Sequence, residues 1–435
     1  MVTNDWSRRL ALLAVVAVLP TACAREGTAP VAESPTPEPP ETETETEPVA
    51  RNTGDGILKF GTLLPETGSL AFLGPPMIAG VRLAVEDINK AGGVLGQDVT
   101  VTLGDSGDTT TDIANQTTDR LLRERVDAII GAASSAVTFT VIDKIVGADV
   151  IMFSPANTSK RLTTYDDEGL YFRTAPSDIM QGQVLGELVV ADGSSRVALM
   201  ALQDPYGEGL LEDTAASIEA SGGQVVERII YDPNAQNFDP EVDRVAAANP
   251  DAIVVIGFDE SARILAAMIE RNIGPGDKKV YGADGNMSAT LAEQVDPQNK
   301  AVLQGMKGTS PLPAENQAFF DRLAAFQPDL RDRTYAAESY DAVVLVALAA
   351  LIAGTDQPRA VAEEINGVTK GGEKCTDFAA CARLVADGTK DIDYDGASGP
   401  LDFIDAGEPG SGTYGILEIQ ADGSIKTLRN EQATL

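Results

Sequence analysis

Residues 57–96 contain the pattern that most constrains the fold of this chain. The apolar run 57–64 stops at Pro65, which is typical of a buried strand that leads into a loop. From about Pro75 the apolar residues recur at helical spacing, and Gly92-Gly93 supply a stop that tolerates the left-handed conformation. A strand, a loop and a helix in this order predict the first unit of an open α/β sheet, whose ligands bind at the carboxyl ends of the strands.

The remaining sequence repeats this alternation, so we predict an α/β fold with parallel, doubly wound sheets. Residues 57–435 are too many for one compact core and suit two lobes. A run near 342–353 is apolar enough to be a buried core helix. The strands are expected at 99–103, 128–130, 150–153, 171–174, 197–201, 224–230, 252–256 and 279–282, with helices between them and near 315–326 and 335–353, and antiparallel strands at 399–404 and 415–419.

The first predicted helix carries small residues in a specific order. They are Gly80, Ala84, Ile88-Asn89, Ala91-Gly92-Gly93 and Gly96. This order resembles the opening of the branched-chain amino-acid binding proteins, which are type I periplasmic binding proteins that deliver solutes to ABC importers. The same spacing would let the helix backbone at Gly80 and Ala84 come close to the sheet.

The resemblance extends over about residues 57–430 and implies a division of the chain. Lobe 1 is expected at 57–175 plus 312–396, and lobe 2 at 176–311 plus 397–435. Three segments would join them as a hinge, at 174–177, 309–313 and roughly 394–400.

The N-terminus has the pattern of an export signal. Arg8-Arg9 precede the apolar run Leu10–Leu19, which is too short to span a bilayer but suits residues 1–22 as a signal peptide. Small residues before Cys23 resemble the lipobox of bacterial lipoproteins, although Pro20 stands where a Leu-like residue is usual. We therefore expect Cys23 to be lipidated and to hold the protein on the outer face of the membrane. The alternative is an ordinary cleaved signal with an incidental cysteine.

Residues 23–56 are predicted to be a disordered linker, because they are rich in Pro, Glu and Thr and carry few large apolar side chains. Further along, Cys375 and Cys381 lie six residues apart. In an extracytoplasmic protein they are expected to form a disulfide, and two buried thiols are the alternative.

Composition excludes several classes of function. The chain has no histidine, so Ser-His-Asp sites, Cys-His sites and His-ligated zinc are absent, and we expect neither a metal nor a cofactor. The net charge of −33 argues against nucleic acid as a partner. Chemistry by a pair of carboxylates stays formally open.

The predicted ligand residues of lobe 1 follow two strand ends. Ser134 and Ser135 come after the strand at 128–130 and would open a helix, where free amides and a hydroxyl bind an anion. In the family, the serine aligned with Ser135 binds the amino-acid carboxylate; taken alone, a serine such as Ser135 is more often a simple N-cap. Asn157 and Thr158 belong to a segment that resembles the family's "SPxxT". The resemblance gives Thr158 to the carboxylate and the Asn157 carbonyl to the ammonium group, whereas a turn with an N-cap is the plain alternative.

The remaining predicted ligand residues rest on the resemblance. Tyr206 lies in a "DxYGxG" loop and would close over the ligand, and Phe258 falls where the family has a pocket aromatic. Asp284 stands where the family usually has a glutamate that binds the ligand ammonium. Leu73, in the first loop, would meet the ligand side chain.

These features predict a lipid-anchored binding protein that captures a branched-chain amino acid or similar small molecule and delivers it to an ABC permease. The expected partners are that ligand, the permease and the membrane. A ligand-sensing receptor of the same fold is the first alternative. An extracellular hydrolase with two carboxylates is the second, and it would need two acids facing each other across the cleft.

Overall fold

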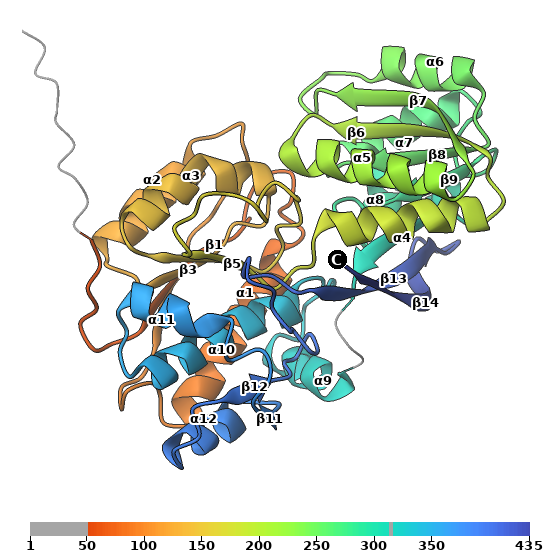
Figure 1. The fold of residues 1–435 in the computed structure, drawn as a ribbon. Helices are drawn as coiled ribbons and strands as arrows, with labels where there is room; N and C mark the ends of the chain where they lie inside the picture. The colour runs from red at the N-terminus through yellow and green to blue at the C-terminus, as the bar shows by residue number, and fades with distance from the viewer. Residues whose placement is uncertain (1–50, 313–315) are drawn as a thin grey trace, which may run out of the picture. The chain divides into compact units, whose positions relative to one another are not determined.

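The computed structural model describes residues 51–312 and 316–435, which fold around two large β-sheets (Figure 1). The first sheet is parallel throughout, in the order β2-β1-β3-β4-β5, as the sequence predicted. We call this sheet and the helices packed on it lobe 1. Its strands are β1 (Lys59–Leu63), β2 (Thr100–Thr102), β3 (Ala128–Gly131), β4 (Ile151–Ser154) and β5 (Tyr171–Arg173).

Helices cover both faces of the lobe 1 sheet (Figure 1). Strands β3 and β4 are therefore buried along their whole length, which explains their continuous apolar sequences. One face carries α1 (Gly74–Lys90), α10 (Ala336–Ala353) and α11 (Pro358–Ile365), and the other carries α2 (Ile113–Arg123) and α3 (Ser135–Gly147). Beyond these lie α9 (Gln317–Phe326), α12 (Phe378–Ala386) and a small parallel pair, β11 (Glu373–Cys375) and β12 (Ile392–Tyr394).

Helix α10 is long and apolar enough to span a membrane, but 83% of it is buried inside the domain, as predicted for a core helix. It packs on α1, and Gly80 is the point of closest approach. A Cβ atom on Gly80 would lie 2.1 Å from the carbonyl oxygen of Ala336. The sequence predicted a close approach of this glycine to the sheet; the neighbour is α10 instead.

The second sheet has the order β14-β13-β10-β9-β8-β6-β7, and we call it, with its helices, lobe 2. The five strands from β10 to β7 are parallel, whereas β13 and β14 are antiparallel and extend one edge. The strands are β6 (Arg196–Leu202), β7 (Gln224–Tyr231), β8 (Ala252–Ile256), β9 (Lys279–Gly282), β10 (Lys307–Pro311), β13 (Ser411–Ile419) and β14 (Ile425–Thr434); the helices are α4 (Asp178–Ala191), α5 (Pro205–Ala220), α6 (Asp239–Ala248), α7 (Ser261–Glu270), α8 (Leu291–Val295) and the 3-10 turn η1 (Lys300–Leu303).

The chain passes between the two lobes three times, as the resemblance implied. The first crossing joins β5 to α4, the second leads from β10 to α9, and the third leads from β12 to β13. The residue boundaries of the lobes stay a prediction. Part of the second expected hinge, 309–313, is strand: residues 309–311 belong to β10.

Three expectations near the ends of elements need correction. Residues 399–404 form no strand, and Phe403 makes only an isolated bridge with Pro409. Strand β10 was not recognised, because its sequence KGTSP has a single β-branched residue, Thr309, beside Gly308 and Pro311, which are uncommon in strands. The described chain is tied to lobe 1 before Ile57: the buried Asn52 side chain donates to the Val126 carbonyl oxygen (3.0 Å) and to Asp127 (2.8 Å).

The two remaining cysteines are joined as Cys375–Cys381, with their Cα atoms 5.3 Å apart. The bond ties β11 to α12 at the periphery of lobe 1. Cys23 and the expected signal peptide and most of the linker lie outside the described residues.

Candidate functional site

A cavity with about 280 Å³ of empty space lies between residues of both lobes, and we call it the inner cavity. It lies at the carboxyl ends of β3 and β4 on one side and of β8 and β9 on the other, the edge at which open α/β sheets bind ligands. Its lining contains seven of the eight predicted ligand residues. The lining residues are Leu70, Leu73, Ala133, Ser134, Ser135, Ala156, Thr158, Tyr206, Phe258, Asp284, Gly285 and Tyr335.

The start of α3 forms one end of the inner cavity. Ser134 is the N-cap, and its hydroxyl oxygen accepts a hydrogen bond from the Val137 amide at 3.3 Å. Ser135 is the first helical residue, so the plain N-cap alternative applies to Ser134 and not to Ser135. The Ser135 hydroxyl oxygen accepts from the Ser159 amide at 3.3 Å, and its own proton is free for a ligand. Amides and hydroxyls at a helix start favour an anion such as a carboxylate.

The loop that follows β4 brings Thr158 to the same end of the cavity. The loop is held by Ser154, whose hydroxyl donates to the Ala132 carbonyl oxygen (2.6 Å) and accepts from the Asn157 amide (2.9 Å). Thr158 is buried, and its carbonyl oxygen accepts from the Asp178 amide at 2.8 Å. Thr158 therefore lines the cavity from a fixed backbone, and its hydroxyl lies close to the buried carboxyl of Asp178.

Asn157 is the predicted ligand residue that does not line the inner cavity. Its side-chain amide donates to the Ala133 carbonyl oxygen at 2.8 Å, and its Oδ1 accepts from Thr138 and Tyr171. Its main-chain carbonyl oxygen accepts from Arg173 at 3.3 Å. Asn157 therefore stabilises the loop. Its main-chain carbonyl, which was predicted to accept from the ligand ammonium group, already accepts from the guanidinium of Arg173.

Lobe 2 contributes an aromatic wall. Asp204 caps α5 by accepting from the Gly207 amide at 2.6 Å, and this fixes Tyr206 in the first turn. The rings of Tyr206 and Phe258 stack with centroids 5.5 Å apart and planes 12° from parallel. Stacked rings present a rigid apolar surface at low entropic cost.

Asp284 is the carboxylate of the inner cavity, and neutral donors surround it. Its Oδ1 accepts from Gln181 Nε2 (2.9 Å) and from the Tyr206 hydroxyl (3.0 Å), and its Oδ2 accepts from the Tyr335 hydroxyl (2.7 Å). Burial raises the pKa of Asp284, while these three hydrogen bonds favour its charged form. A carboxylate has room for about four donors, so one position is left for a cationic group of a ligand.

A second acid, Asp178, lies behind this end of the cavity in the first turn of α4. It is fully buried, and neither of its carboxyl oxygens has a hydrogen-bond partner among the described residues. Burial raises its pKa well above the usual range, and the nearby charge of Asp284 adds to the effect. Asp178 is thus expected to be protonated, which avoids two unpaired charges in one buried region.

The sequence did not single out Tyr335 or Gln181. Tyr335 precedes α10 with a left-handed backbone (φ 59°), and the residue belongs to the last quarter of the chain, far from any strand end. Gln181 lies one turn into α4, on a helix whose sequence marks it only as buried. No local motif marks either residue, since both act through contacts with distant residues: Tyr335 donates to Asp284, and Gln181 donates to Asp284 and Thr309.

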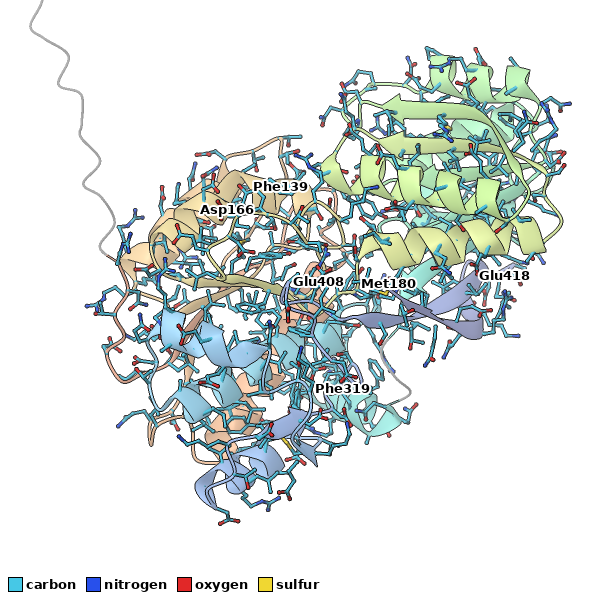
Figure 2. The ribbon with its side chains drawn as sticks, viewed as in Figure 1. Phe139, Asp166, Met180, Phe319, Glu408 and Glu418 are labelled. Carbon is cyan, nitrogen blue, oxygen red and sulfur yellow. A yellow bond between two sulfur atoms is a disulfide. The ribbon has the colours of Figure 1, made fainter. Side chains whose placement is uncertain are left out.

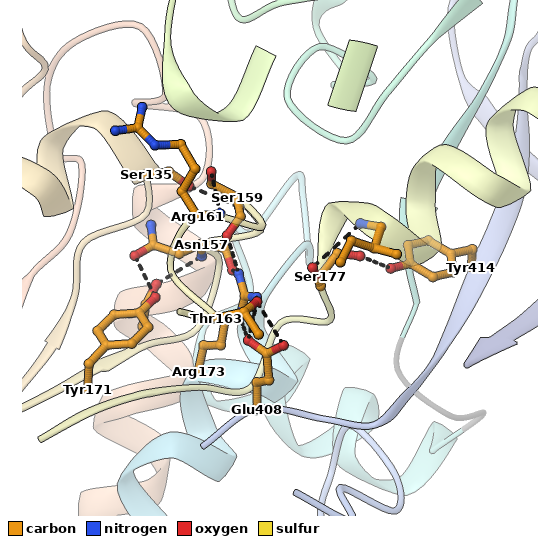
Figure 3. A network of polar contacts seen from close by, with 12 residues as sticks. Ser135, Asn157, Ser159, Arg161, Thr163, Tyr171, Arg173, Ser177, Glu408 and Tyr414 are labelled. Carbon is orange, nitrogen blue, oxygen red and sulfur yellow. Dashed lines mark hydrogen bonds and ion pairs between the residues drawn. The ribbon is translucent and has the colours of Figure 1, made fainter. Parts of the chain in front are cut away.

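We call the loop between β4 and β5, residues 155–170, the ligand loop. A buried ion pair connects it to the first and third crossings (Figure 3). Arg173, at the end of β5, donates through Nε to Glu408 at 2.7 Å, and both side chains are at most 1% exposed. Glu408 lies in the segment that leads from β12 to β13 (Figure 2). The same guanidinium donates to the Ser159 carbonyl oxygen (2.9 Å) and to Thr163 (3.0 Å), so every charge and donor has a partner.

Two further contacts join the ligand loop to α5 of lobe 2. The Ser159 hydroxyl donates to the Pro205 carbonyl oxygen at 2.8 Å, and Lys160 Nζ lies 2.9 Å from Asp213. Pro205 precedes Tyr206 directly, so the loop that carries Thr158 also contacts the turn that carries the aromatic wall.

The inner cavity adjoins a larger outer cavity with about 1360 Å³ of empty space, and the two share Ser134 and Phe258. Its charged lining residues are Asp108, Asp204, Asp232, Asp259, Glu260 and Arg263. Five acids and one base make the approach acidic, which favours molecules that carry a positive group. Within the part of the chain that the structure describes, no group of three or more acidic or cysteine side chains could hold a metal ion.

Comparisons with known proteins identify the family of this chain. Residues 57–424 match the profile of a family described as "periplasmic binding protein". The chain is 27% identical over 382 residues to the chemotactic signal transduction system substrate-binding protein BasB of Halobacterium salinarum, a match that covers 84% of this chain and 88% of that protein.

Solved structures share the fold. The leucine binding protein LivK from Thermotoga maritima matches with a TM-score of 0.71 at 21% identity, over 86% of this chain and 98% of that one. A solute binding protein of an ABC transporter from R. palustris, in complex with benzoate, matches with a TM-score of 0.68 at 19% identity, over 87% and 98% of the two chains.

Proposed function

Because the chain belongs to the periplasmic binding protein family, whose members bind solutes for ABC transporters, we propose that it captures a small zwitterionic amino acid, of the branched-chain type or similar, and delivers it to an importer. The observation that carries this proposal is the chemical polarity of the inner cavity. Ser135 and Thr158 at the start of α3 and in the ligand loop suit a carboxylate, and Asp284 at the other end suits an ammonium group. A buried zwitterion needs both of its charges matched.

The apolar part of the lining supports a compact aliphatic side chain. Leu70 and Leu73 belong to the loop before α1, and Ala133 and Ala156 end the turns after β3 and β4. The stacked rings of Tyr206 and Phe258 complete this surface. Small and aliphatic residues around a small cavity favour a ligand such as leucine, isoleucine or valine.

Lobe closure follows from the division of the site. Lobe 1 supplies the hydroxyls and lobe 2 supplies Asp284, so a zwitterion has full contacts only when both lobes meet it. A ligand with different affinities for the open and closed forms shifts their populations toward the closed form.

The N-terminal pattern supports delivery at the outer face of the membrane. A lipid on Cys23 would keep the protein near a permease, and the Cys375–Cys381 disulfide is compatible with an oxidising compartment. Mass spectrometry of the protein from membranes tests the lipid directly: a diacylglyceryl modification at Cys23 supports the anchor, and a soluble chain cut elsewhere contradicts it.

A sensor is the second candidate, because the relative BasB is named as a substrate-binding protein of a chemotactic system. Ligand capture is the same in both roles. Co-purification of the full-length protein with a permease supports import, and co-purification with a signalling membrane protein supports sensing.

A carboxylate-pair hydrolase finds less support. Among the described residues, Asp284 is the one carboxylate in the inner lining, whereas such an enzyme needs two that flank the scissile bond. Asp178 lies on α4 of the same lobe and not across the cavity.

A thermal-shift screen of residues 24–435 tests the proposed ligand. L-leucine, L-isoleucine and L-valine are compared with 4-methylpentanoate, which is leucine without its ammonium group, and with benzoate. A ligand at 100 times its Kd adds about 2.7 kcal/mol, a rise in Tm of several degrees. We expect the amino acids to shift the Tm and 4-methylpentanoate to leave it unchanged.

Two variants refine this screen. Asp284→Asn should lose the shift with amino acids, and the exposed Asp259→Asn at the outer cavity should keep it. A shift with benzoate alone would replace the amino acid by an aromatic acid, and retention of leucine binding in Asp284→Asn would contradict the role of Asp284.

A further inference from the structure

A separate cavity lies at the crossings between the lobes, and we call it the hinge cavity. It has about 710 Å³ of empty space. Thr174 and Pro176 of the first crossing, Pro311 and Leu312 of the second, and Pro409 and Ser411 of the third all line it. A cavity walled by all three connections between the lobes changes its shape whenever the lobes move.

Glu338, in the first turn of α10, is the one ionisable residue among those that line the hinge cavity. Its side chain is 3% exposed, and its Oε2 is enclosed without a hydrogen-bond partner among the described residues. The other polar lining groups are neutral, for example the hydroxyls of Thr174, Ser398 and Ser411. The carboxyl has its own backbone amide as a donor but no side-chain donor, and a buried oxygen without a partner is costly.

The surrounding charges do not supply this partner. Asp341, one turn further along α10, already accepts from the Tyr394 hydroxyl (2.7 Å) and from the Ala397 amide (2.8 Å), and its charge repels a Glu338 carboxylate. Arg173 precedes Thr174 but is bound to Glu408. Tyr335, one turn earlier, donates to Asp284. None of these side chains supplies a donor, so the Glu338 carboxyl either keeps its proton or pairs with a donor from outside the described chain.

We propose that the hinge cavity is a second binding site, which takes the protonated amino group of a small primary amine on the Glu338 carboxylate. The neutral hydroxyls around it would accept the remaining N–H groups of the ammonium. A single carboxylate among neutral acceptors matches a single charge, and the cavity has space for a molecule larger than a bare ion.

Occupation of this site biases the movement of the lobes. An amine that bridges Glu338 on lobe 1 and hydroxyls on the crossings binds one arrangement of the hinge better than others. By linkage, it then changes the affinity of the inner cavity, and the inner ligand changes its affinity in return.

A proton competes with the amine. Burial raises the pKa of Glu338 to about 8, so below that pH the carboxyl is mostly neutral in the empty protein. An amine has to displace this proton, and its binding should strengthen as the pH rises from 6 to 9. The amine itself stays protonated over this range.

Thermal unfolding of the full chain with methylammonium chloride tests the proposal without any inner ligand. At 50 mM and pH 8.5 we expect methylammonium to raise the Tm by about 2 °C or more over the same concentration of KCl, and to do less at pH 6. Glu338→Gln keeps the size of the side chain and should abolish the difference. The exposed Glu363→Gln on α11 is the matched control and should retain it.

Each outcome decides the proposal. Equal shifts with methylammonium and KCl at both pH values would overturn it, and so would an amine effect that survives in Glu338→Gln. If Glu338→Gln folds poorly, Glu338→Asp is the second variant: it keeps the carboxylate but withdraws it by one methylene, and it should reduce the methylammonium effect at pH 8.5. Failure of this test leaves leucine binding in the inner cavity unaffected.

Discussion

The hydroxyl of Tyr335 donates a 2.7 Å hydrogen bond to Oδ2 of Asp284, and this bond joins the residue before α10 in lobe 1 to the loop after β9 in lobe 2. It gives the carboxylate its third neutral donor. The bond therefore has two effects: it stabilises the charge of Asp284, and it holds the two sides of the inner cavity together.

Tyr335→Phe removes this bond and leaves the ring in place. A hydrogen bond to a buried charged group contributes about 1.5–3 kcal/mol, so the free energy of unfolding at pH 7 should fall by about that amount. Urea unfolding measures it. Tyr165→Phe is the control, because Tyr165 also donates to a carboxylate, Asp143, but at an exposed site; it should change stability by less than about 0.5 kcal/mol. Equal effects of the two variants would contradict a special role for Tyr335.

Glu408→Gln should destabilise the protein strongly. The variant leaves Arg173 buried with its charge unmatched, and the loss of one partner from a buried ion pair costs about 3–5 kcal/mol. Chemical denaturation monitored by circular dichroism gives the value. The exposed pair Arg429–Glu431 supplies the control: Glu431→Gln should have an effect near zero. A small effect of Glu408→Gln would mean that water enters the network of Figure 3.

The stability of the protein should decrease as the pH rises from about 4 to about 7. Burial raises the pKa of Asp204 to about 7 and that of Asp127 to about 7. The folded state therefore binds more protons than the unfolded state between the ordinary aspartate pKa and about 7, which favours folding at the acidic end of this window.

Asp204→Asn tests this pH dependence, because asparagine caps a helix as well as aspartate does. The slope of unfolding free energy against pH should become shallower by up to about one proton between pH 4 and 7. Asp422→Asn, at an exposed turn where the pKa is lowered, should not flatten the slope in this way. An unchanged slope in Asp204→Asn would show that Asp204 ionises normally in the folded protein.

Gly80→Ala should push α1 and α10 apart. The added Cβ would meet the Ala336 carbonyl oxygen at 2.1 Å, and overpacking in a core costs about 1–3 kcal/mol, although alanine is the better helix former. Gly147→Ala in α3 is the control, because no atom lies within 4 Å of the new Cβ; it should be neutral or slightly stabilising. Differential scanning calorimetry of both variants decides, and a stable Gly80→Ala would mean that the helices separate easily.

The sequence predicted the parts of the fold that depend on local periodicity. Strands such as β8 and helices such as α10 have bounds within one residue of the prediction, because a buried strand or helix repeats its apolar pattern along its own length. Strand β10 was missed for the opposite reason: its place in the sheet comes from pairing with β9 and β13, and its own residues do not favour a strand.

The residues of the candidate site also fall into a group that the sequence could predict and a group that it could not. Ser135, Thr158 and Asp284 follow predictable strand ends, and the family resemblance gave them their ligand roles, so these residues could be named before the structure. Tyr335 and the Arg173–Glu408 pair depend on contacts between segments that are 51 and 235 residues apart, and no short pattern contains both partners. The family resemblance assigned the carbonyl of Asn157 to the ligand, and the local motif gives no sign that Arg173 donates to it.

The ligand loop has a consequence for how such a protein can change its ligand over evolutionary time or in the laboratory. Thr158, Ser159 and Lys160 are consecutive, yet they respectively line the cavity, bind the guanidinium of Arg173 and contact Asp213 on the opposite lobe. A substitution in this loop changes both the lining of the inner cavity and the contacts between the lobes, so few substitutions here should change the ligand without also changing lobe movement. The side chains of Phe258 and Leu73 line the inner cavity without hydrogen bonds of this kind to the other lobe. A biosensor with a new specificity is best sought by varying those positions first.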